Sequence, residues 1–514
     1  MMSFLSLNTT QPAGAAVRAS GLDTIVPGVP WTDTSGHLIQ GHGGGVIKVK
    51  STYYWIGQDN SMRNGMTKRT SMACYSSADL IHWSFIADVL TNTSPGFRKY
   101  IAPDLTAGSA LNRPKVLYNK LTGKYVMYVV VAKGASPRSP DEFQLTVATS
   151  SKPCGRYSYV KAPFQPRGNP SGDIGLYQEN GKGYLLSEDT GNPDHCSACP
   201  RCGKPRPSTA ACSVRGLYIY KLSPNFLKVV RLVHRFSKDD EAPALFKAAN
   251  GTYFVLASGK TGFAPNNNQY ATASSLTGSW SRWRDFAPRG SDTEISQTMS
   301  VLKVSGTKGT TYIYLGDRWN GNDLGDSTYV WQPLDVRGTT LKLSQHESWS
   351  INVRTGTSVD DGKPYFYLTN LNSGKVLEQV GTKTTQGKFN GGASQQWQVL
   401  GFNYAGPGNN VPHYMIVNRS STASSRREKV LESMSSSPGA KVGLGTWSGG
   451  KNTKQEWEFS SVGGGPDLQF INVGSRGLVL SVASASTASG APIDQEKNTT
   501  AKSQQWSLTE VAGH

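Results

Sequence analysis

Gln395-Gln396-Trp397 recurs twice more in this chain, as Gln455-Glu456-Trp457 and Gln504-Gln505-Trp506. The tryptophans are 60 and then 49 residues apart, which suits one small subdomain per copy. Each copy closes a segment that opens with alternating apolar and polar residues, the pattern of half-buried strands: residues 365–372, 415–418 and 468–472. A tryptophan at this interval indicates a core position shared by three lobes. We therefore predict a pseudo-threefold all-β domain at residues 361–512.

These three lobes resemble the ricin-B-type β-trefoil, the family 13 carbohydrate-binding module. In such lobes an acidic residue after a Val-Leu pair binds sugar hydroxyls, and an aromatic ring further on stacks on the sugar. The resemblance implies sugar-binding residues in the first two lobes: Glu378, Phe389, Asn390 and Gln395, then Glu432, Trp447 and Gln455. The third lobe has Ser481 and Lys497-Asn498 instead, so we expect its pocket to be degenerate. Two weak sites on one chain gain by avidity on a polymer.

The composition fits a turn-rich β-protein of two or three domains. The chain has 514 residues, 56 glycines, 10% aromatic residues and 17% charged residues. No run of 18 apolar residues occurs, so we expect no membrane span. The formal net charge is +18, but the basic residues are scattered, which argues against nucleic acid as a partner.

The six cysteines are unevenly distributed. Cys74 and Cys154 lie in strand-like segments, whereas four others crowd one polar stretch: Cys196, Cys199, Cys202 and Cys212. These four thiols could hold a structural zinc ion or form two local disulfides. We favour the disulfides, because a sugar-handling chain of this kind is expected outside the cell.

The first two-thirds of the chain carries a weaker repeat. An apolar strand, a short Gly or Asn turn and an aromatic strand recur at residues 45–58, 113–131, 173–187, 241–258 and 297–317. Most of these hairpins precede a second strand pair, and the units recur about every 60 residues. The repeat predicts a five-bladed β-propeller at residues 20–350, with a large β-sandwich as the alternative. The whole chain is thus expected to be all-β.

In a propeller, the first residues of the innermost strands converge on the central channel. Those positions carry polar groups from five separate repeats: His42, Asn112, Asp173, Glu241 and Gln297. A pocket of the size of one sugar ring at this end of the channel follows from that geometry.

Glycoside hydrolysis needs a carboxylic acid that protonates the leaving oxygen. Glu241 is the best candidate, because an interior strand position raises a carboxyl pKa and keeps the group protonated near neutral pH. A surface Glu at a strand start is the alternative reading. Asp173 could tune that pKa or hold a sugar hydroxyl, or simply cap a turn. Glu188 could contact hydroxyls, or only begin the cysteine-rich loop.

The same region is similar to glycoside hydrolase family 43, and in particular to its exo-β-1,3-galactanase branch. The matching strings are Pro30–Gly36, Gln40–Gly45, Thr52–Trp55, Ser76–Trp83, Arg113–Val116 and Asp240–Pro243. This branch lacks the Asp that serves as general base elsewhere in the family. The resemblance implies that Glu241 is the general acid, that Gln297 serves the water side, and that Asp173 contacts substrate. We also expect His42, at the start of the first inner strand, to contact substrate.

One position departs from the branch, which reads Glu-Arg-Pro-Lys-Val where this chain has Asn112 before Arg113. That Glu is thought to support catalysis, and an amide cannot carry charge or exchange a proton. A natural divergence, a weakened enzyme and an engineered inactive variant are all compatible with the change.

The resemblances together predict a secreted, monomeric, inverting enzyme that releases galactose from β-1,3-galactan, the backbone of arabinogalactan. We expect no cofactor and no metal ion. Another family 43 activity, on arabinofuranosides or β-xylosides, is the second hypothesis. The third is a lectin-like binding protein whose pocket is catalytically inactive because Asn112 replaces the expected Glu.

Overall fold

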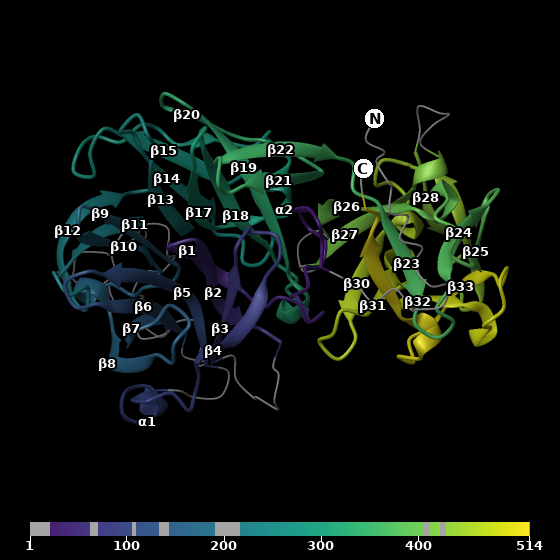
Figure 1. Ribbon diagram of the computed structural model, residues 1–514, viewed down its shortest axis with the longest axis horizontal. Helices are drawn as coiled ribbons and strands as arrows, with labels where there is room; N and C mark the ends of the chain where they lie inside the picture. The colour runs from purple at the N-terminus through teal and green to yellow at the C-terminus, as the bar shows by residue number, and fades with distance from the viewer. Residues whose placement is uncertain are drawn as a thin grey trace, which may run out of the picture.

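The computed structural model describes residues 21–61, 70–104, 109–132, 143–190, 216–404, 411–421 and 428–512. These residues form two β-domains that lie side by side, one coloured from purple through teal to green and the other from green to yellow (Figure 1). The helices among them are single turns, α1 (Phe97–Tyr100) and α2 (Asp292–Ile295). No helix of the described chain is long and apolar enough to cross a membrane.

The first domain contains five antiparallel sheets, each of four consecutive strands. The first two sheets are β1 (His42–Val49), β2 (Thr52–Asp59), β3 (Ser71–Ser77), β4 (Ser84–Leu90), then β5 (Ala110–Asn119), β6 (Lys124–Ala132), β7 (Phe143–Ser150), β8 (Ser158–Phe164). The third is β9 (Ile174–Glu179), β10 (Lys182–Asp189), β11 (Gly216–Leu222), β12 (Val229–Phe236). The last two are β13 (Asp240–Lys247), β14 (Tyr253–Gly259), β15 (Gln269–Ala273), β16 (Arg284–Asp285), then β17 (Gln297–Ser305), β18 (Thr310–Arg318), β19 (Thr328–Arg337), β20 (Thr340–Leu343).

The five sheets are the blades of a propeller. Their first strands contact one another in the order β1, β5, β9, β13, β17 and back to β1, which closes a ring around a central channel. The predicted hairpins are the inner strand pairs, and Gly123 and Gly251 take positive φ at two of the turns, as expected from their sequence. The five-bladed prediction is therefore confirmed, and the β-sandwich alternative is wrong.

The second domain has twelve strands in three groups of four. They are β23 (Phe366–Asn370), β24 (Val376–Val380), β25 (Lys383–Gly387), β26 (Trp397–Tyr404); β27 (Pro412–Asn418), β28 (Lys429–Ser433), β29 (Ala440–Thr446), β30 (Trp457–Ser461); β31 (Leu468–Asn472), β32 (Leu478–Val482), β33 (Ile493–Lys497), β34 (Trp506–Glu510). A short 3-10 turn ends at the Gln of each Gln-x-Trp repeat, and the Trp then starts the fourth strand of its group.

The three repeat tryptophans occupy equivalent places in the core of this trefoil. Trp397, Trp457 and Trp506 are fully buried. Each indole nitrogen donates to the carbonyl of the Leu at the same position of its lobe, at 2.9, 3.0 and 3.1 Å. The indole ring fills the centre and its one polar atom is satisfied, so the repeat marks a core position.

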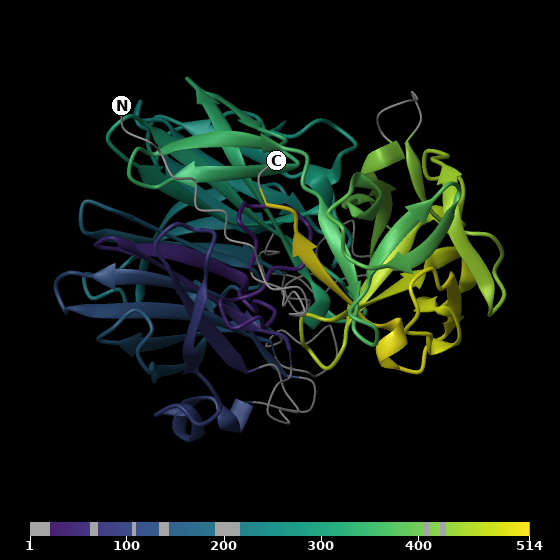
Figure 2. The same ribbon diagram turned by 45° about the vertical axis from the view of Figure 1, so that its right-hand side comes forward.

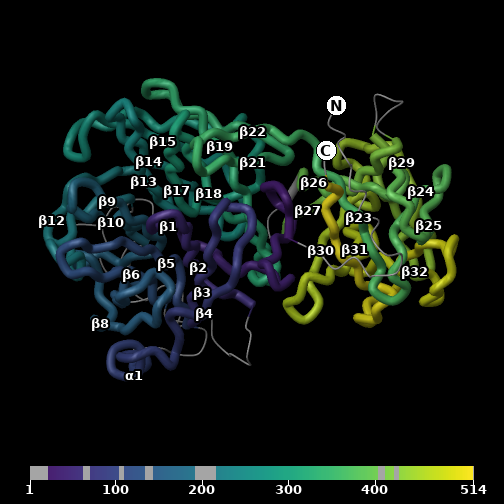
Figure 3. The backbone as a smooth tube through the Cα atoms, in the orientation of Figure 1, coloured from purple at the N-terminus to yellow at the C-terminus, as the bar shows by residue number. Residues whose placement is uncertain are grey.

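A small hairpin joins the two domains and is formed by β21 (Ser348–Asn352) and β22 (Thr357–Gly362). One continuous apolar core runs from the propeller into the trefoil and includes Trp31, Trp331, Trp349 and Trp457. The segment 21–41, purple in Figure 3, lies on the side of the propeller that faces the trefoil. The domains remain adjacent in the turned view of Figure 2.

A disulfide connects the first two blades. Cys74 in β3 bonds to Cys154, which lies between β7 and β8, with the two Cα atoms 5.7 Å apart. The other four cysteines, for which disulfides or zinc were predicted, lie outside the described residues: Cys196, Cys199, Cys202 and Cys212.

Candidate active site

The innermost strands are irregular where they enter the channel. Their pairing shifts between His42 and Gly45, between Asn112 and Lys115, between Glu241 and Ala244, and between Thr298 and Ser300. A bulge bends its strand and redirects a side chain, and it is common beside active sites. Four blades thus have a bulge in the inner strand at the end of the channel where the polar residues were predicted to meet.

Two of these bulges hold non-glycine residues in the left-handed region. Arg113 and Ala242 both have φ of 51°. Such residues persist where the surrounding structure over-determines them, typically at functional sites. Gly43 (φ 59°) belongs to the same set, and a Cβ there would lie 2.9 Å from Gln58 Oε1.

Arg113 connects the candidate residues of three blades. Its Nε donates to Asp173 Oδ1 at 2.8 Å, and its Nη2 lies 2.8 Å from Asp173 Oδ2. Nη2 also donates to Gln297 Oε1. The Gln297 amide in turn donates from Nε2 to Glu241 Oε1 at 2.7 Å, while Trp319 Nε1 donates to Gln297 Oε1 at 2.9 Å. The structure therefore brings Glu241, Gln297 and Asp173 together, as predicted from the sequence.

Glu188 joins this cluster from the end of β10. Its Oε2 accepts the backbone N–H of Asp173 at 2.8 Å, and Lys260 Nζ lies 2.8 Å from its Oε1. Burial raises the pKa of Glu188, and the charge of Lys260 opposes that rise. Lys260 also contacts Asp239, at 2.7 Å.

The charges of this cluster explain the state of Glu241. The carboxyls of Asp173, Glu188 and Glu241 lie within 4.8 Å of one another. Asp173 pairs with Arg113 and Glu188 with Lys260, but Glu241 forms no ion pair with a Lys or Arg in the described parts of the chain. Burial, reinforced by the two neighbouring carboxylates, raises the pKa of Glu241 to about 9. Glu241 thus holds a proton at neutral pH, which is the state that a general acid needs.

The same three carboxylates could in principle hold a cation, since hard cations prefer oxygen ligands. Arg113 and Lys260 already supply two positive charges at those oxygens. The arrangement therefore suits an acid with supporting ion pairs.

His42 occupies a different place from the one expected. It is fully buried, with Nδ1 3.4 Å from Asp317 Oδ1 and its ring stacked on Tyr329 at 4.9 Å. Asp317 Oδ2 also accepts the N–H of Gly43 at 3.0 Å. Because the His42 ring is buried against Asp317 and Tyr329 at the first bulge, it exposes no surface that a substrate could contact. The side chain therefore supports the backbone of the bulge.

Asn112 lies half-buried in β5, immediately before Arg113. No hydrogen bond joins its amide to the Glu241–Gln297–Arg113 network within the described residues. Its place at the bulge agrees with the predicted channel position. What the amide does there stays a prediction.

Sequence reasoning missed three members of the site. Arg113 stands in a quoted motif at the start of an inner strand but received no role, although a basic residue among acidic strand starts is a signal that the sequence carries. Lys260 and Trp319 lie beyond β14 and β18, and no local pattern marks them. Only the ring closure of the propeller places them beside Glu188 and Gln297.

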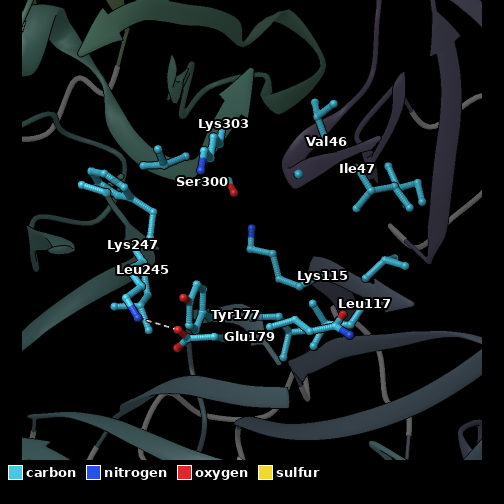
Figure 4. Close-up of a pocket in the computed structure, with 18 of the residues that line it drawn as sticks. Val46, Ile47, Lys115, Leu117, Tyr177, Glu179, Leu245, Lys247, Ser300 and Lys303 are labelled. Atoms are coloured by element: carbon cyan, nitrogen blue, oxygen red, sulfur yellow. Dashed lines mark hydrogen bonds and ion pairs between the residues drawn. The ribbon is translucent and has the colours of Figure 1, made fainter. Parts of the chain in front are cut away.

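The other end of the channel opens into a cavity of about 720 Å³ (Figure 4). Every blade contributes to its wall, as the labelled residues show: Val46, Ile47, Lys115, Leu117, Tyr177, Glu179, Leu245, Lys247, Ser300 and Lys303. Lys115 separates the two ends, because its Nζ donates to the carbonyls of Gly43 and Gly44 at 2.5 Å. Burial, aided by the Arg113 charge, lowers the pKa of Lys115 to about 7.

The first trefoil lobe arranges its predicted residues around the carboxylate of Glu378, which fills the space that a Cβ at Gly387 would need. Phe389 is 55% exposed and packs edge-on against Tyr367, so one face is free for stacking. Asn390 is exposed beside it. Gln395 is fully buried and donates to the Lys388 carbonyl at 2.8 Å, so it holds the loop rather than facing solvent.

The second lobe repeats this arrangement. Glu432 accepts hydrogen bonds from Asn452 at 2.9 Å and from Gln455 at 2.8 Å, which orients the carboxylate. Trp447 packs edge-on against Phe402 at 4.7 Å. In the third lobe Ser481 is buried at the acidic position, and Gln504 still holds its loop through the Lys497 carbonyl at 2.7 Å. Gln455 likewise donates to the Thr446 carbonyl at 2.9 Å, so the Gln of the repeat fixes a loop in all three lobes.

Comparisons with known proteins agree with this architecture. The family model "Glycosyl hydrolases family 43" matches residues 44–329, and "Ricin-type beta-trefoil lectin domain-like" matches residues 393–496 and 453–514. No curated protein matches the chain.

Solved structures match both domains. The exo-beta-1,3-galactanase of Clostridium thermocellum is 28% identical with a TM-score of 0.55, over 95% of this chain and 100% of that one. An exo-beta-1,3-galactanase of Phanerochaete chrysosporium with galactose is 26% identical with a TM-score of 0.56, over 92% and 99%. A putative exo-beta-1,3-galactanase of Bifidobacterium bifidum is 28% identical with a TM-score of 0.53 and covers 65% of this chain and 100% of its own. The chain therefore belongs to the glycosyl hydrolases of family 43, and it is a glycoside hydrolase with a ricin-type β-trefoil domain.

Proposed function

We propose that this hydrolase releases galactose from the non-reducing end of β-1,3-galactan with inversion of configuration. The observation that carries the proposal is the hydrogen bond between a protonated Glu241 and Gln297 at the end of a channel built from five blades. Relatives that share this architecture over nearly the whole chain are described as exo-beta-1,3-galactanases. A channel closed at one side by the Lys115 bonds favours attack at a chain end.

The residues of the cluster have different roles in the proposed hydrolysis. Glu241 gives its proton to the leaving glycosidic oxygen, and burial together with the carboxylates of Asp173 and Glu188 keeps that proton in place until the substrate arrives. Gln297 Oε1 already accepts from Arg113 and Trp319, and one N–H donates to Glu241. A sugar that enters the site must break this Gln297–Glu241 hydrogen bond, after which the amide can hold a water on the opposite face of the sugar. The water then adds to the anomeric carbon and its proton passes to solvent, while the leaving oxygen takes the proton of Glu241. Arg113 fixes both Gln297 and Asp173, so the acid and the water are positioned by one guanidinium.

The proposed activity also accounts for the role of the trefoil domain and for an extracellular location of the protein. Glu378 with Phe389, and Glu432 with Trp447, would keep the enzyme on a polymeric galactan while the channel removes single sugars. The Cys74–Cys154 disulfide supports an extracellular location, since disulfides persist in oxidising compartments.

A test follows galactose release from β-1,3-galactobiose and from a longer β-1,3-galactan by chromatography, with the first anomer identified by proton NMR. We expect prompt α-galactose from the protein and none from Glu241→Gln. Release of pentose from aryl pentosides instead of galactose would favour another family 43 activity.

A second candidate is a galactan-binding protein whose catalysis is impaired, because Asn112 stands where the branch has Glu. Activity of Asn112→Glu alone would support it. No release by either form would refute the galactanase proposal.

A further inference from the structure

Gln297 follows a segment of unusual backbone. The four residues of α2 are not glycine, yet all are left-handed, with φ of 48° at Asp292, 55° at Thr293, 55° at Glu294 and 56° at Ile295. L-residues disfavour this conformation, and consecutive examples persist only where neighbouring groups hold them. The turn ends at Ile295, two residues before Gln297, so its geometry sets where that amide points.

The propeller holds the first half of the turn. Thr293 Oγ1 accepts the N–H of Asn268 at 2.8 Å and donates to the Asn266 carbonyl at 3.1 Å. Glu294 is held at its carboxylate by Gln332, at 2.8 Å. These contacts fix the side chains of α2 but leave the carbonyls of Glu294 and Ile295 to another partner.

Arg318 at the end of β18 is that partner. Its Nη2 donates to the Glu294 carbonyl at 2.8 Å and its Nε to the Ile295 carbonyl at 3.3 Å. The side chain is only 4% exposed, and it forms no ion pair with a carboxylate of the described residues. Its hydrogen bonds go to backbone carbonyls, including Gly28 at 3.5 Å. A buried guanidinium used in this way fixes backbone, because its planar fork holds two acceptors at once.

The trefoil covers Arg318 from the other side. Its guanidinium lies 5.9 Å from the ring centre of Tyr414 in β27, and the Tyr414 hydroxyl donates to the same Gly28 carbonyl at 3.1 Å. A Cβ added at Gly401 in β26 would lie 2.3 Å from Arg318 Nη1. The turn α2 also contacts β26, and the two labels are adjacent in Figure 1. The trefoil backbone is thus shaped around a propeller side chain.

We propose that Arg318 is a positioning residue for Gln297, acting through α2, and that the trefoil domain keeps it in place. The inference rests on the proposed function for its kinetic consequence, but not for its structural one. The trefoil then has a role in the chemical step that is separate from binding polysaccharide.

Two substitutions test the proposal from opposite sides. Arg318→Lys replaces the rigid planar fork by an ammonium on a flexible stem, so the fixed geometry of the two carbonyl bonds is lost. Gly401→Ala changes only the trefoil and pushes one methyl group against Arg318 Nη1. The control is Glu510→Gln, which weakens a different contact between the domains, the 2.7 Å hydrogen bond from Thr24. All three proteins are studied as full chains, and thermal unfolding confirms that each is folded.

The first measurement is kcat and KM on β-1,3-galactobiose, a substrate too small to occupy trefoil and channel together. We expect kcat to fall about ten-fold or more in both variants with KM little changed, because a displacement of ~1 Å in a positioned group can cost ~100-fold. The control should keep the kcat of the unmodified protein. A lower unfolding temperature with unchanged kcat would show a merely structural role and overturn the proposal.

The second measurement needs no substrate, so it decides the structural part even if galactobiose proves not to be hydrolysed. Hydrogen–deuterium exchange is followed by mass spectrometry on peptides that contain residues 292–298. We expect faster exchange there in Arg318→Lys and Gly401→Ala but not in Glu510→Gln. Unchanged exchange in Gly401→Ala would refute the coupling to the trefoil, and absence of galactose release by the unmodified chain would refute only the proposed function.

Discussion

Glu241→Gln should strongly lower kcat on galactobiose and stabilise the protein, and the gain in stability should depend on pH. The substitution keeps the shape and the hydrogen bond from Gln297 but removes the ionisable proton. In the folded protein, burial together with Asp173 and Glu188 raises the pKa of Glu241 from 4.5 to about 9. The unfolded chain releases this proton at the ordinary value, so folding at neutral pH takes a proton up from solvent.

The size of the effect follows from linkage. Because the folded state binds the extra proton, the free energy of unfolding of the unmodified protein falls by about 1.4 kcal/mol per pH unit between the two pKa values. At pH 7 the cost relative to a neutral amide is at most about 3 kcal/mol, and it is below about 1 kcal/mol at pH 5. Glu241→Gln has no such proton to bind. Its free energy of unfolding should therefore exceed that of the unmodified protein by an amount that grows from pH 5 to pH 8.

The assay is urea unfolding of both proteins at several pH values. Glu179→Gln is a control of opposite sign: burial alone would raise the pKa of Glu179, but hydrogen bonds from Lys247 and Tyr253 lower it. A lowered pKa stabilises the folded protein above about pH 4.5. Glu179→Gln should therefore be destabilised throughout pH 5–8, with a difference that closes only in acid. A pH-independent difference for Glu241→Gln would refute the protonated acid.

The kinetic half of this prediction uses the same variant. Loss of a general acid lowers kcat by about 10²–10⁴-fold. The loss should be largest for galactobiose and much smaller for an aryl galactoside whose leaving group needs no proton. Equal losses on both substrates would mean that Glu241 does not protonate the leaving oxygen.

Three further outcomes are expected. Asn112→Glu adds a carboxylate beside Arg113 and should raise kcat on galactobiose by about ten-fold or more; an unchanged rate would mean that position 112 needs no carboxylate. Replacing Cys74 and Cys154 by Ala should lower the free energy of unfolding by about 2–4 kcal/mol, because the bridge closes a long loop, and equal urea midpoints would contradict this. Glu432→Gln should weaken retention on β-1,3-galactan in affinity electrophoresis, and unchanged mobility would exclude the second lobe as a sugar site.

The fold was predictable because its signals repeat. A tryptophan that returns at intervals of 60 and 49 residues must fill equivalent core places, and each indole nitrogen does bond the same Leu carbonyl. Five hairpins of similar pattern imply five similar sheets. The pairing of Cys74 with Cys154 was not predictable, since it depends on how two neighbouring blades are rotated about the channel.

The active site was predictable only as far as position along a strand determines it. Glu241, Gln297 and Asp173 start inner strands, and a propeller brings all such starts to one place. Whether a carboxyl there acts as an acid or a base depends instead on how many positive and negative side chains surround it. The positive side chains come from residues that no strand pattern marks. Arg113 neutralises Asp173 and Lys260 neutralises Glu188, which leaves Glu241 as the carboxyl that must keep its proton. A fourth carboxylate at position 112 would add one negative charge beside Arg113, so the Asn there changes the charge of the site as well as its hydrogen bonding.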